Sequence, residues 1–294
     1  MDSLESVGKR IATTTNLRSI VRTMKSLSAV SIRQYEEASD ALRQYNETIE
    51  LGLHVVLRRR AVPAPLVTSS DGGAGLIVFG SDYGLCGRFN EQITQFARSE
   101  SSTQGARPRR WLPIGARVSA LLESAGEEVD ACHFLPGSVS GMTATAHSIL
   151  LKVDEWRETH EIEQVLLVHN RRENGANSVP HLVRLLPLDT DWLRRLAQRH
   201  WPSRRLPTFT MNDADLFSFL VRQHLFVAIF RAGVDSIASE HTTRLASMQA
   251  AERNIDEHLD EMSAAFRRKR QQTITEEMMD IVAGYETLMA PGDR

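Results

Sequence analysis

Hydrophobic positions repeat with a helical period at both ends of the chain. Residues 4–57 and roughly 213–289 contain no proline, so nothing there removes a helical N–H donor. In the first segment, apolar or small side chains recur in alternating steps of four and three residues, the 3.5-residue period of a left-handed coiled coil. The positions are Leu17, Val21, Met24, Ser28, Ser31, Tyr35, Ala38, Leu42, Tyr45, Ile49, Gly52 and Val56. The pattern predicts a long helix that pairs along one seam, with an amphipathic helix covering a globular core as the alternative.

The second long segment begins after Asn212, whose short polar side chain can cap the first turn of a helix. Residues 216–230 are apolar on almost every side, which predicts burial against the central part of the chain. The seam then continues and shifts phase after Phe266. Its positions are Ile237, His241, Leu245, Met248, Glu252, Ile255, Leu259, Met262 and Phe266, then Ile274, Met278, Ile281, Tyr285 and Leu288.

Strand and turn signals dominate the middle of the chain. Pro63, Pro65 and the turn cluster at residues 71–73 end the first helix. A buried strand is predicted at 75–79, a glycine-bearing turn at 80–87 and a helix at 89–99. Further strands are predicted at 111–114, 129–134, 165–169 and 181–186, further helices at 116–125 and 143–159, a polar loop at 170–177, and a linker marked by Pro187, Pro202 and Pro207. Strands that alternate with helices favour a mostly parallel sheet.

The predicted fold class is therefore α/β, with a long antiparallel N- and C-terminal helical coiled coil and a central Rossmann-like α/β domain. The predicted boundaries are 1–60 for the N-terminal coiled-coil helix, 74–188 for the central domain, 189–211 for the linker and 212–290 for the C-terminal coiled-coil helix.

The two long helices are of unequal length, so one end should project. If they pair antiparallel with Val56 near Leu220, Met24 faces the Glu252 region and Met1 falls near Thr275. The remaining tip, about 15 to 20 residues or roughly 20 to 30 Å, carries apolar side chains that need a partner. A bend at Gly284 that folds the tip back is the alternative. The basic run at 267–270 reads either as a solvated face or as a contact with acidic loops of a partner.

Composition excludes several classes of protein. The 294 residues carry a formal charge of −2 with 24% charged side chains, which disfavours a general nucleic-acid binder. Cys86 and Cys132 are too few for a disulfide framework and indicate a reducing compartment. The ten histidines show no paired ligand spacing, so no metal is expected. No uncharged apolar run approaches the roughly 20 residues of a membrane span, and neither a signal peptide nor a transmembrane segment is expected.

The glycine-bearing turn at 80–87 allows two interpretations. It could cradle a phosphate, but its spacing matches neither a dinucleotide-binding nor a Walker loop, and no lysine lies nearby. Glycines that turn the chain tightly between strand and helix are the simpler interpretation. Cys86 could serve as a nucleophile only beside a base, and no neighbouring histidine supplies one. A buried inert thiol is favoured, and no catalytic residue or cofactor is expected.

Several stretches resemble the gamma subunit of F-type ATP synthases. They cover nearly the whole chain and are most specific at its two ends. The stretches are 17–33 (LRSIVRTMKSLSAVSIR), 81–87 (SDYGLCG) with Asn90, 179–187 (VPHLVRLLP), 239–251 (SEHTTRLASMQAA) with Asn254, 270–277 (RQQTITEE), and Ile281 with Val282.

This resemblance implies a non-catalytic central rotor stalk that couples ion flow through the membrane rotor ring to ATP synthesis or hydrolysis. The implied partners are the alpha and beta subunits of the head, the epsilon subunit and the membrane rotor ring, with no nucleic acid. The implied location is the cytoplasmic side of the bacterial inner membrane, peripheral as part of a complex.

The resemblance also implies roles for individual residues. Those at the contact between rotor and stationary head would be Met24, Arg33, Arg244, Arg267, Arg268, Lys269, Arg270, Gln271, Thr275 and Glu277. Those at the upper bearing would be Met278, Ile281, Val282, Tyr285 and Leu288. Arg88, Arg253 and the strongly basic run 267–270 depart from the usual family pattern. From the residues alone, a coiled-coil scaffold with an α/β recognition domain and a nucleotide-dependent enzyme remain alternatives.

Overall fold

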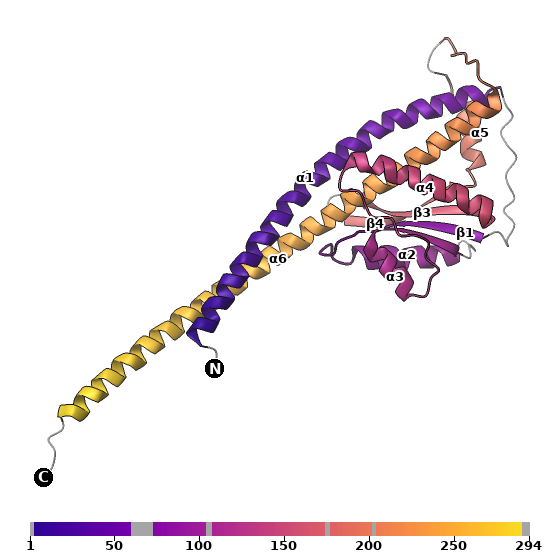
Figure 1. The fold of residues 1–294 in the computed structure, drawn as a ribbon. Helices are drawn as coiled ribbons and strands as arrows, with labels where there is room; N and C mark the ends of the chain where they lie inside the picture. Colours follow the sequence, from indigo (N-terminus) through magenta and orange to yellow (C-terminus); the bar gives the residue numbers. More distant parts are fainter. Residues whose placement is uncertain (1–2, 60–72, 104–107, 174–176, 202–203, 290–294) are drawn as a thin grey trace. The chain divides into compact units, whose positions relative to one another are not determined.

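The computed structural model describes residues 3–59, 73–103, 108–173, 177–201 and 204–289 (Figure 1). The chain divides into two compact units. The terminal unit comprises Met1–Leu27 with Ala246–Arg294, and the central unit comprises Ser28–Leu245.

Within the described residues, four strands form one mixed sheet in the central unit. The strands are β1 (Gly73–Phe79), β2 (Pro108–Ile114), β3 (Ile162–Glu173) and β4 (Asn177–Leu186), in the spatial order β2-β1-β3-β4. β1 runs parallel to both β2 and β3, whereas β4 runs antiparallel to β3. The prediction of a mostly parallel sheet is confirmed, and the antiparallel fourth strand follows from a direct hairpin rather than a helical crossover.

Helices cover both faces of this sheet. α2 (Phe89–Thr103) and α3 (Ala116–Ser124) lie on one face, and α4 (Val139–Thr159) lies on the other with part of α6 (Figure 1). Alternate residues of β1 face opposite sides: Leu76 and Val78 pack with α2 and α3, whereas Ile77 and Phe79 pack with α4 and α6. A strand buried on both faces is expected to be apolar throughout, as β1 is.

The two long segments are helical over nearly the predicted lengths, as α1 (Leu4–Leu57) and α6 (Asp213–Met289). The Asn212 side chain accepts a hydrogen bond of 2.9 Å from the Ala214 amide, as expected of a cap. In the central unit the α1 seam is buried at Ser28, Tyr35, Ile49 and Val56. Tyr45 is the exception at 46% exposure, and its hydroxyl donates to Gln223.

Burial along α6 differs from the prediction. The most buried stretch lies at 227–240, later than the predicted 216–230, and Phe219 remains 53% exposed. The later stretch contains small residues such as Gly233 and Ser236, which let the helix approach the sheet closely. By length and composition alone, α6 contains a window that could span a membrane, with a mean hydropathy of 1.3. In this fold, Val227, Ile229 and Phe230 of α6 supply core contacts.

The terminal unit pairs α1 and α6 antiparallel. Val21 and Met24 pack against Met248 and Ile255 along the predicted seam. Basic side chains of α1 meet acidic side chains of α6: Arg18 contacts Asp256 at 2.7 Å, and both Arg22 and Lys25 contact Glu252. These pairs confirm the expectation that Met24 faces the Glu252 region. Leu17, also predicted on the seam, lines a pocket with Ile255 and Met262 of α6 but remains 50% exposed.

The predicted register is shifted near both ends of the helical pair. In the central unit Leu220 lies against Gly52, one turn before the predicted Val56. In the terminal unit Gly8 lies against Phe266, two residues before position 268 of the predicted register. Because α1 begins at Leu4, the helical overlap ends near residue 270 of α6. Small residues such as Gly52 set the register because they accept a bulky side chain from the facing helix.

Three other local predictions are wrong. The linker at 189–211 contains a helix, α5 (Thr190–Gln198), which Asp189 caps and whose Leu193 and Leu196 are buried. Residues 129–134 form no strand, only single bridges from Val129 and His133 to β2. The loop at 170–177 is shorter, because β3 extends to Glu173 and β4 begins at Asn177.

Candidate partner-binding surfaces

The last described part of α6 exposes a row of apolar side chains. Their exposed fractions are 53% for Ile274, 65% for Met278, 62% for Met279, 73% for Ile281, 44% for Val282 and 61% for Tyr285. α6 remains helical through Gly284 to Met289, so the alternative of a fold back at Gly284 is wrong. Leu288 belongs to this helix, but its side chain lies outside the described residues. Apolar side chains gathered at one helix end indicate a surface that binds a partner.

Polar and basic side chains precede this row. Arg267, Arg268 and Arg270 are exposed, whereas Lys269 is half-buried. Gln271, Thr275 and Glu277 are also exposed, and the Thr275 hydroxyl donates to the Gln271 carbonyl at 2.9 Å. Most side chains of this group can therefore reach a partner, with the charged residues about two to five turns before Tyr285.

Met24 lies at the edge of the seam in the terminal unit. It is half-buried against the cluster of Val21, Met248 and Ile255, and its neighbour Lys25 contacts Glu252. Part of the Met24 side chain therefore packs within this chain, and the rest is accessible to a partner. Two apolar side chains on the same helix that the sequence analysis did not single out are more exposed, namely Ile20 and Leu27 at 57% and 63%.

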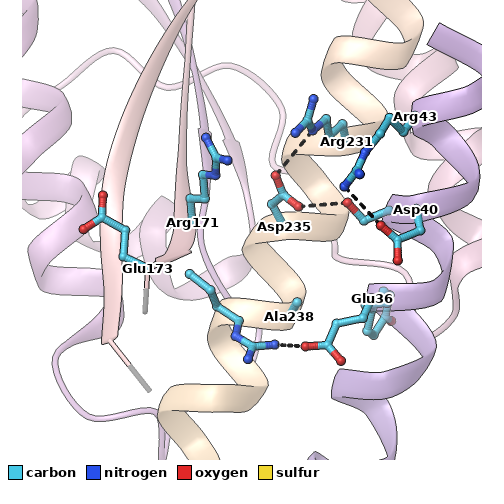
Figure 2. Close-up of a pocket in the computed structure, with 11 residues that line it drawn as sticks. Glu36, Asp40, Arg43, Arg171, Glu173, Arg231, Asp235 and Ala238 are labelled. Carbon is cyan, nitrogen blue, oxygen red and sulfur yellow. Dashed lines mark hydrogen bonds and ion pairs between the residues drawn. The ribbon is translucent and has the colours of Figure 1, made fainter. Parts of the chain in front are cut away.

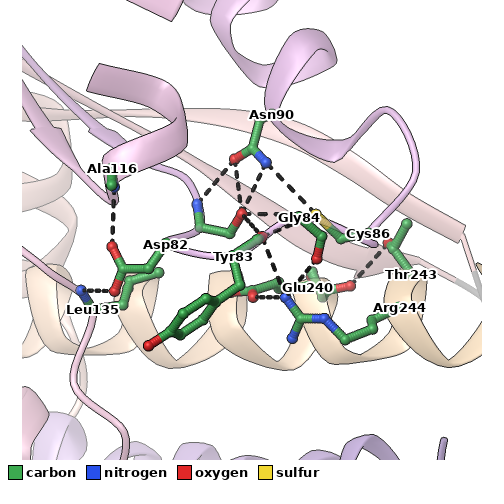
Figure 3. Close-up of polar contacts among 12 residues, drawn as sticks. Asp82, Tyr83, Gly84, Cys86, Asn90, Ala116, Leu135, Glu240, Thr243 and Arg244 are labelled. Atoms are coloured by element: carbon green, nitrogen blue, oxygen red, sulfur yellow. Dashed lines mark hydrogen bonds and ion pairs between the residues drawn. The ribbon is translucent and has the colours of Figure 1, made fainter. Parts of the chain in front are cut away.

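Arg33 and Arg244 lie in the central unit and differ in exposure. Arg33 is exposed on α1, where a partner can reach it. Arg244 is only 7% exposed and forms an ion pair with Glu240, one turn earlier on α6. Its guanidinium also lies within hydrogen-bonding distance of the Tyr83 and Gly84 carbonyls (Figure 3). The structure therefore brings Arg244 to the loop at 81–87.

The interior of that loop is filled by its own side chains. The Ser81 amide donates to Asn90 Oδ1 at 2.9 Å, and Asn90 Nδ2 donates to Ser81 Oγ at 2.8 Å (Figure 3). Cys86 is 1% exposed beside them, and burial raises the pKa of its thiol. A neutral buried thiol is a poor nucleophile, and the filled interior supports the interpretation as a tight turn.

Sequence analysis missed two exposed side chains on this loop and the acid beneath it. Tyr83 and Leu85 are 77% and 58% exposed, and Leu85 has a left-handed backbone with φ of 65°. Glu240 is buried at 6% exposure. The four-residue spacing of Glu240 and Arg244 is a recognisable helical pair in the sequence, but nothing local reveals that the pair is buried.

A charged crevice of about 490 Å³ lies between α1, β3 and α6 in the central unit (Figure 2). Four arginines and four carboxylates line it: Arg43, Arg171, Arg172, Arg231, Glu36, Asp40, Glu173 and Asp235. Arg172 pairs with Glu36, Arg43 with Asp40, and Arg231 with Asp235. Because four positive and four negative charges balance and six of them form these pairs, the crevice offers no excess charge to a ligand. Among the described residues, no cluster of His, Cys, Asp or Glu has the arrangement of a metal site.

Comparison with known sequences identifies one family over almost the entire chain. A model of the ATP synthase family, ATP-synt, matches residues 3–288. The chain is 28% identical over 292 residues to the ATP synthase gamma chain of Geotalea uraniireducens, covering 98% of this chain and 99% of that one. It is 25% identical to the gamma chain of Brucella anthropi over 98% of this chain and 100% of the relative.

Solved structures share the fold. A chain in the Euglena gracilis mitochondrial ATP synthase, determined as OSCP/F1/c-ring, aligns with a TM-score of 0.67 and 14% identity, covering 99% of this chain and 96% of that chain. A chain in the rotor of the same enzyme aligns with a TM-score of 0.63 and 14% identity, over 92% and 98% of the two chains. The chain therefore belongs to the ATP synthase family, with the gamma chains that form the non-catalytic central stalk of the F-type enzyme.

Proposed function

We propose that this chain is the rotor stalk that couples ion flow through a membrane ring to ATP synthesis or hydrolysis in a hexamer of alpha and beta subunits. The observation that carries this proposal is the end of α6. Its apolar side chains from Ile274 to Tyr285 are exposed beyond the overlap with α1. A helix end of this kind requires an apolar sleeve, which the hexamer would supply.

The remaining partners follow from the same proposal. The chain is part of an ATP synthase, a membrane-associated complex. Within it, we infer contacts with the alpha and beta subunits of the head, the epsilon subunit and the membrane rotor ring. The proposed location is the cytoplasmic side of a bacterial inner membrane, as a peripheral component with no catalytic residue or cofactor of its own.

The proposed mechanism is mechanical and requires no chemistry on this chain. As the stalk turns, it presents different side chains to each catalytic subunit, and the difference in contact free energy favours a different conformation of each site. Met278, Ile281, Val282, Tyr285 and Leu288 would form the upper bearing. Methionine is flexible and polarizable, so Met278 can adapt to several neighbours in turn.

Polar residues together with Met24 would supply the contacts below the bearing. The proposed contacts with the head are Met24, Arg33, Arg267, Arg268, Lys269, Arg270, Gln271, Thr275 and Glu277. Basic side chains at 267–270 would attract acidic loops of the head, an interaction that salt should weaken. Arg244, which the resemblance also places at this contact, is buried.

Reconstituted particles test the proposal. Truncation of the chain after Gln272 should weaken torque or assembly, because it removes the exposed apolar row. A finer comparison is Ile281→Ser against Asp280→Ser, two neighbouring positions on the same exposed helix. The first should lower torque and the second should not. Undiminished ATP-driven rotation and ATP synthesis in the truncated particle would exclude the proposed role of the tip.

A further inference from the structure

A buried ion pair fastens α6 to the loop at 81–87 in the central unit. Glu240 and Arg244 are 6% and 7% exposed and contact each other one turn apart on α6. The same Arg244 Nη2 atom lies 3.5 Å from the Tyr83 carbonyl oxygen and 3.4 Å from that of Gly84 (Figure 3). One guanidinium therefore joins a carboxylate on its own helix to two consecutive carbonyls of a distant loop.

Burial makes this arrangement costly unless every partner is present. Taking a carboxylate and a guanidinium out of water carries a desolvation penalty that a bare ion pair does not always recover. Burial raises the pKa of Glu240, and Arg244 opposes the shift by its charge and hydrogen bond. Nη2 of Arg244 makes all three contacts, and a guanidinium is more weakly hydrated than the ammonium of lysine, so its burial costs less.

The loop is also tied down from its other side. Asp82 accepts hydrogen bonds from the Ala116 amide at 3.0 Å and from the Leu135 amide at 2.9 Å. Ser81 Oγ donates to the Tyr83 carbonyl at 2.8 Å. The backbone is thus fixed at several points, including a left-handed Leu85 that a free loop would rarely adopt.

This rigid backbone presents apolar side chains to solvent. Tyr83 is 77% exposed and Leu85 is 58% exposed. A loop that served only to connect β1 with α2 would need neither the fixed conformation nor two large apolar side chains in water. A stiff, exposed apolar contact is suited to transmitting force between rotor and head, because a flexible one would yield under load.

We propose that Arg244, held by Glu240, is a positioning residue that fixes the loop at 81–87 so that Tyr83 and Leu85 contact the stationary head. Arg244 acts through the loop and does not itself touch the head. This inference rests on the proposed rotor function, which supplies the head as the partner. A positioning role accounts for the burial of Arg244, whereas a direct contact with the head would not.

Reactivity of the Cys86 thiol measures the loop conformation without any partner. Replacing Cys132 by Ser leaves Cys86 as the single cysteine, and Cys86 lies 3.6 Å from Asn90 Nδ2 beneath the loop. In this background of the full chain, Arg244→Met and Glu240→Gln should each raise the rate of alkylation at least about tenfold, equivalent to roughly 1.4 kcal/mol of easier opening. Arg244→Lys should fall between them and the parent, and Arg157→Met, at an exposed position of α4, should match the parent.

The thiol measurement separates loop positioning from general unfolding. Thermal unfolding of the same variants shows whether the chain remains folded at the assay temperature. If Arg244→Met proves unfolded there, Glu240→Gln and Arg244→Lys provide the same test. An alkylation rate that stays at the parent value in folded variants would overturn the positioning role.

The contact with the head is tested in complexes of the full chain with the alpha/beta hexamer alone. Tyr83→Ser/Leu85→Ser should lower torque about as much as Arg244→Met, and combining all three changes should lower it no further. Additive losses would show that Arg244 contacts the head directly. A loss that appears only when epsilon is added would move the contact to epsilon and overturn the assignment to the head. Failure of the Ile281→Ser test would instead remove the rotor function while the thiol result still stands.

Discussion

Gly75 in β1 lies directly beneath the indole ring of Trp156 in α4. A Cβ atom at position 75 would overlap ring atoms Cε3 and Cζ3, and Trp156 is fully buried with no room to shift. We therefore expect Gly75→Ala to lower the free energy of unfolding by about 1–3 kcal/mol, the usual cost of overpacking a core. Chemical denaturation of the isolated chain measures this.

Gly137→Ala is the matched control, because nothing lies within 4 Å of a Cβ built at that position. It should leave stability nearly unchanged. Equal stability of Gly75→Ala and the parent would mean that the strand and α4 separate more easily than their packing implies.

A buried histidine, His169, and a half-buried one, His241, should make the stability of the chain depend on pH. Burial lowers the pKa of His169 to about 4, and burial together with the nearby Arg244 lowers the pKa of His241 to about 4. The unfolded chain binds protons near the ordinary pKa of 6.5, so it takes up more protons than the folded chain between pH 6.5 and 4. Stability should fall as pH falls through this window, by up to about 3 kcal/mol for each histidine.

Substituting one histidine isolates its contribution. His169→Leu should flatten the decline of unfolding free energy between pH 6.5 and 4 relative to the parent chain. His258→Leu, at an exposed position on α6, is the control and should leave the slope unchanged. A slope that is the same in His169→Leu and the parent would show that His169 is protonated without cost in the folded chain.

The two long helices could be predicted because the sequence features that specify a helix lie within the helix itself. Absence of proline and the 3.5-residue seam predict both helices, and their approximate pairing followed from placing Val56 near Leu220. Helix α5 was missed because prolines on either side suggested a linker, although Leu193 and Leu196 have helical spacing.

Burial of polar groups could not be predicted in the same way. Arg244 on α6 reads as an ordinary charged residue of a helical surface, since its loop partners Tyr83 and Gly84 are about 160 positions away in the sequence. The exposed row at the end of α6 was predictable because it depends on a difference in helix length. Contacts of the individual side chains with other subunits depend on surfaces that this chain does not contain.

Charge pairing in the terminal unit should also respond to pH. Hydrogen bonds from Lys25 and then Arg22 lower the pKa of Glu252. The stabilisation is therefore present above the unfolded pKa of Glu252 and is lost as pH falls through its lower folded pKa. At neutral pH, Glu252→Gln should be less stable than the parent, and the difference should shrink at acidic pH and at high salt.

Glu257→Gln, an exposed position on the same helix, controls for a general change of charge. Thermal unfolding over a range of pH compares the three chains. A stability difference between Glu252→Gln and the parent that persists unchanged below the folded pKa would mean that the ion pair is not its source.

Met24 offers the sharpest test of coupling, because its half-buried side chain packs in the seam on one side and is open to solvent on the other. It packs beside Val21 and Met248, while Arg22 and Lys25 already place two positive charges on the same turn. Met24→Lys would add a third charge at the proposed contact with the head, where it would either attract an acidic group of the head or repel a basic one. In either case, the free energy of contact between stalk and head would no longer vary with the rotation angle as coupling requires. We expect fewer ions pumped per ATP hydrolysed in reconstituted vesicles.

Thr23→Lys separates this effect from the added charge itself. Thr23 is exposed on the neighbouring position of α1 and lies outside the apolar cluster around Met24. It should leave the ratio of ions to ATP unchanged, while Met24→Lys lowers it with the rate of ATP hydrolysis retained. If both variants pump as many ions per ATP as the parent, Met24 is not at a contact that governs coupling, and its half-buried position serves only the helical pair.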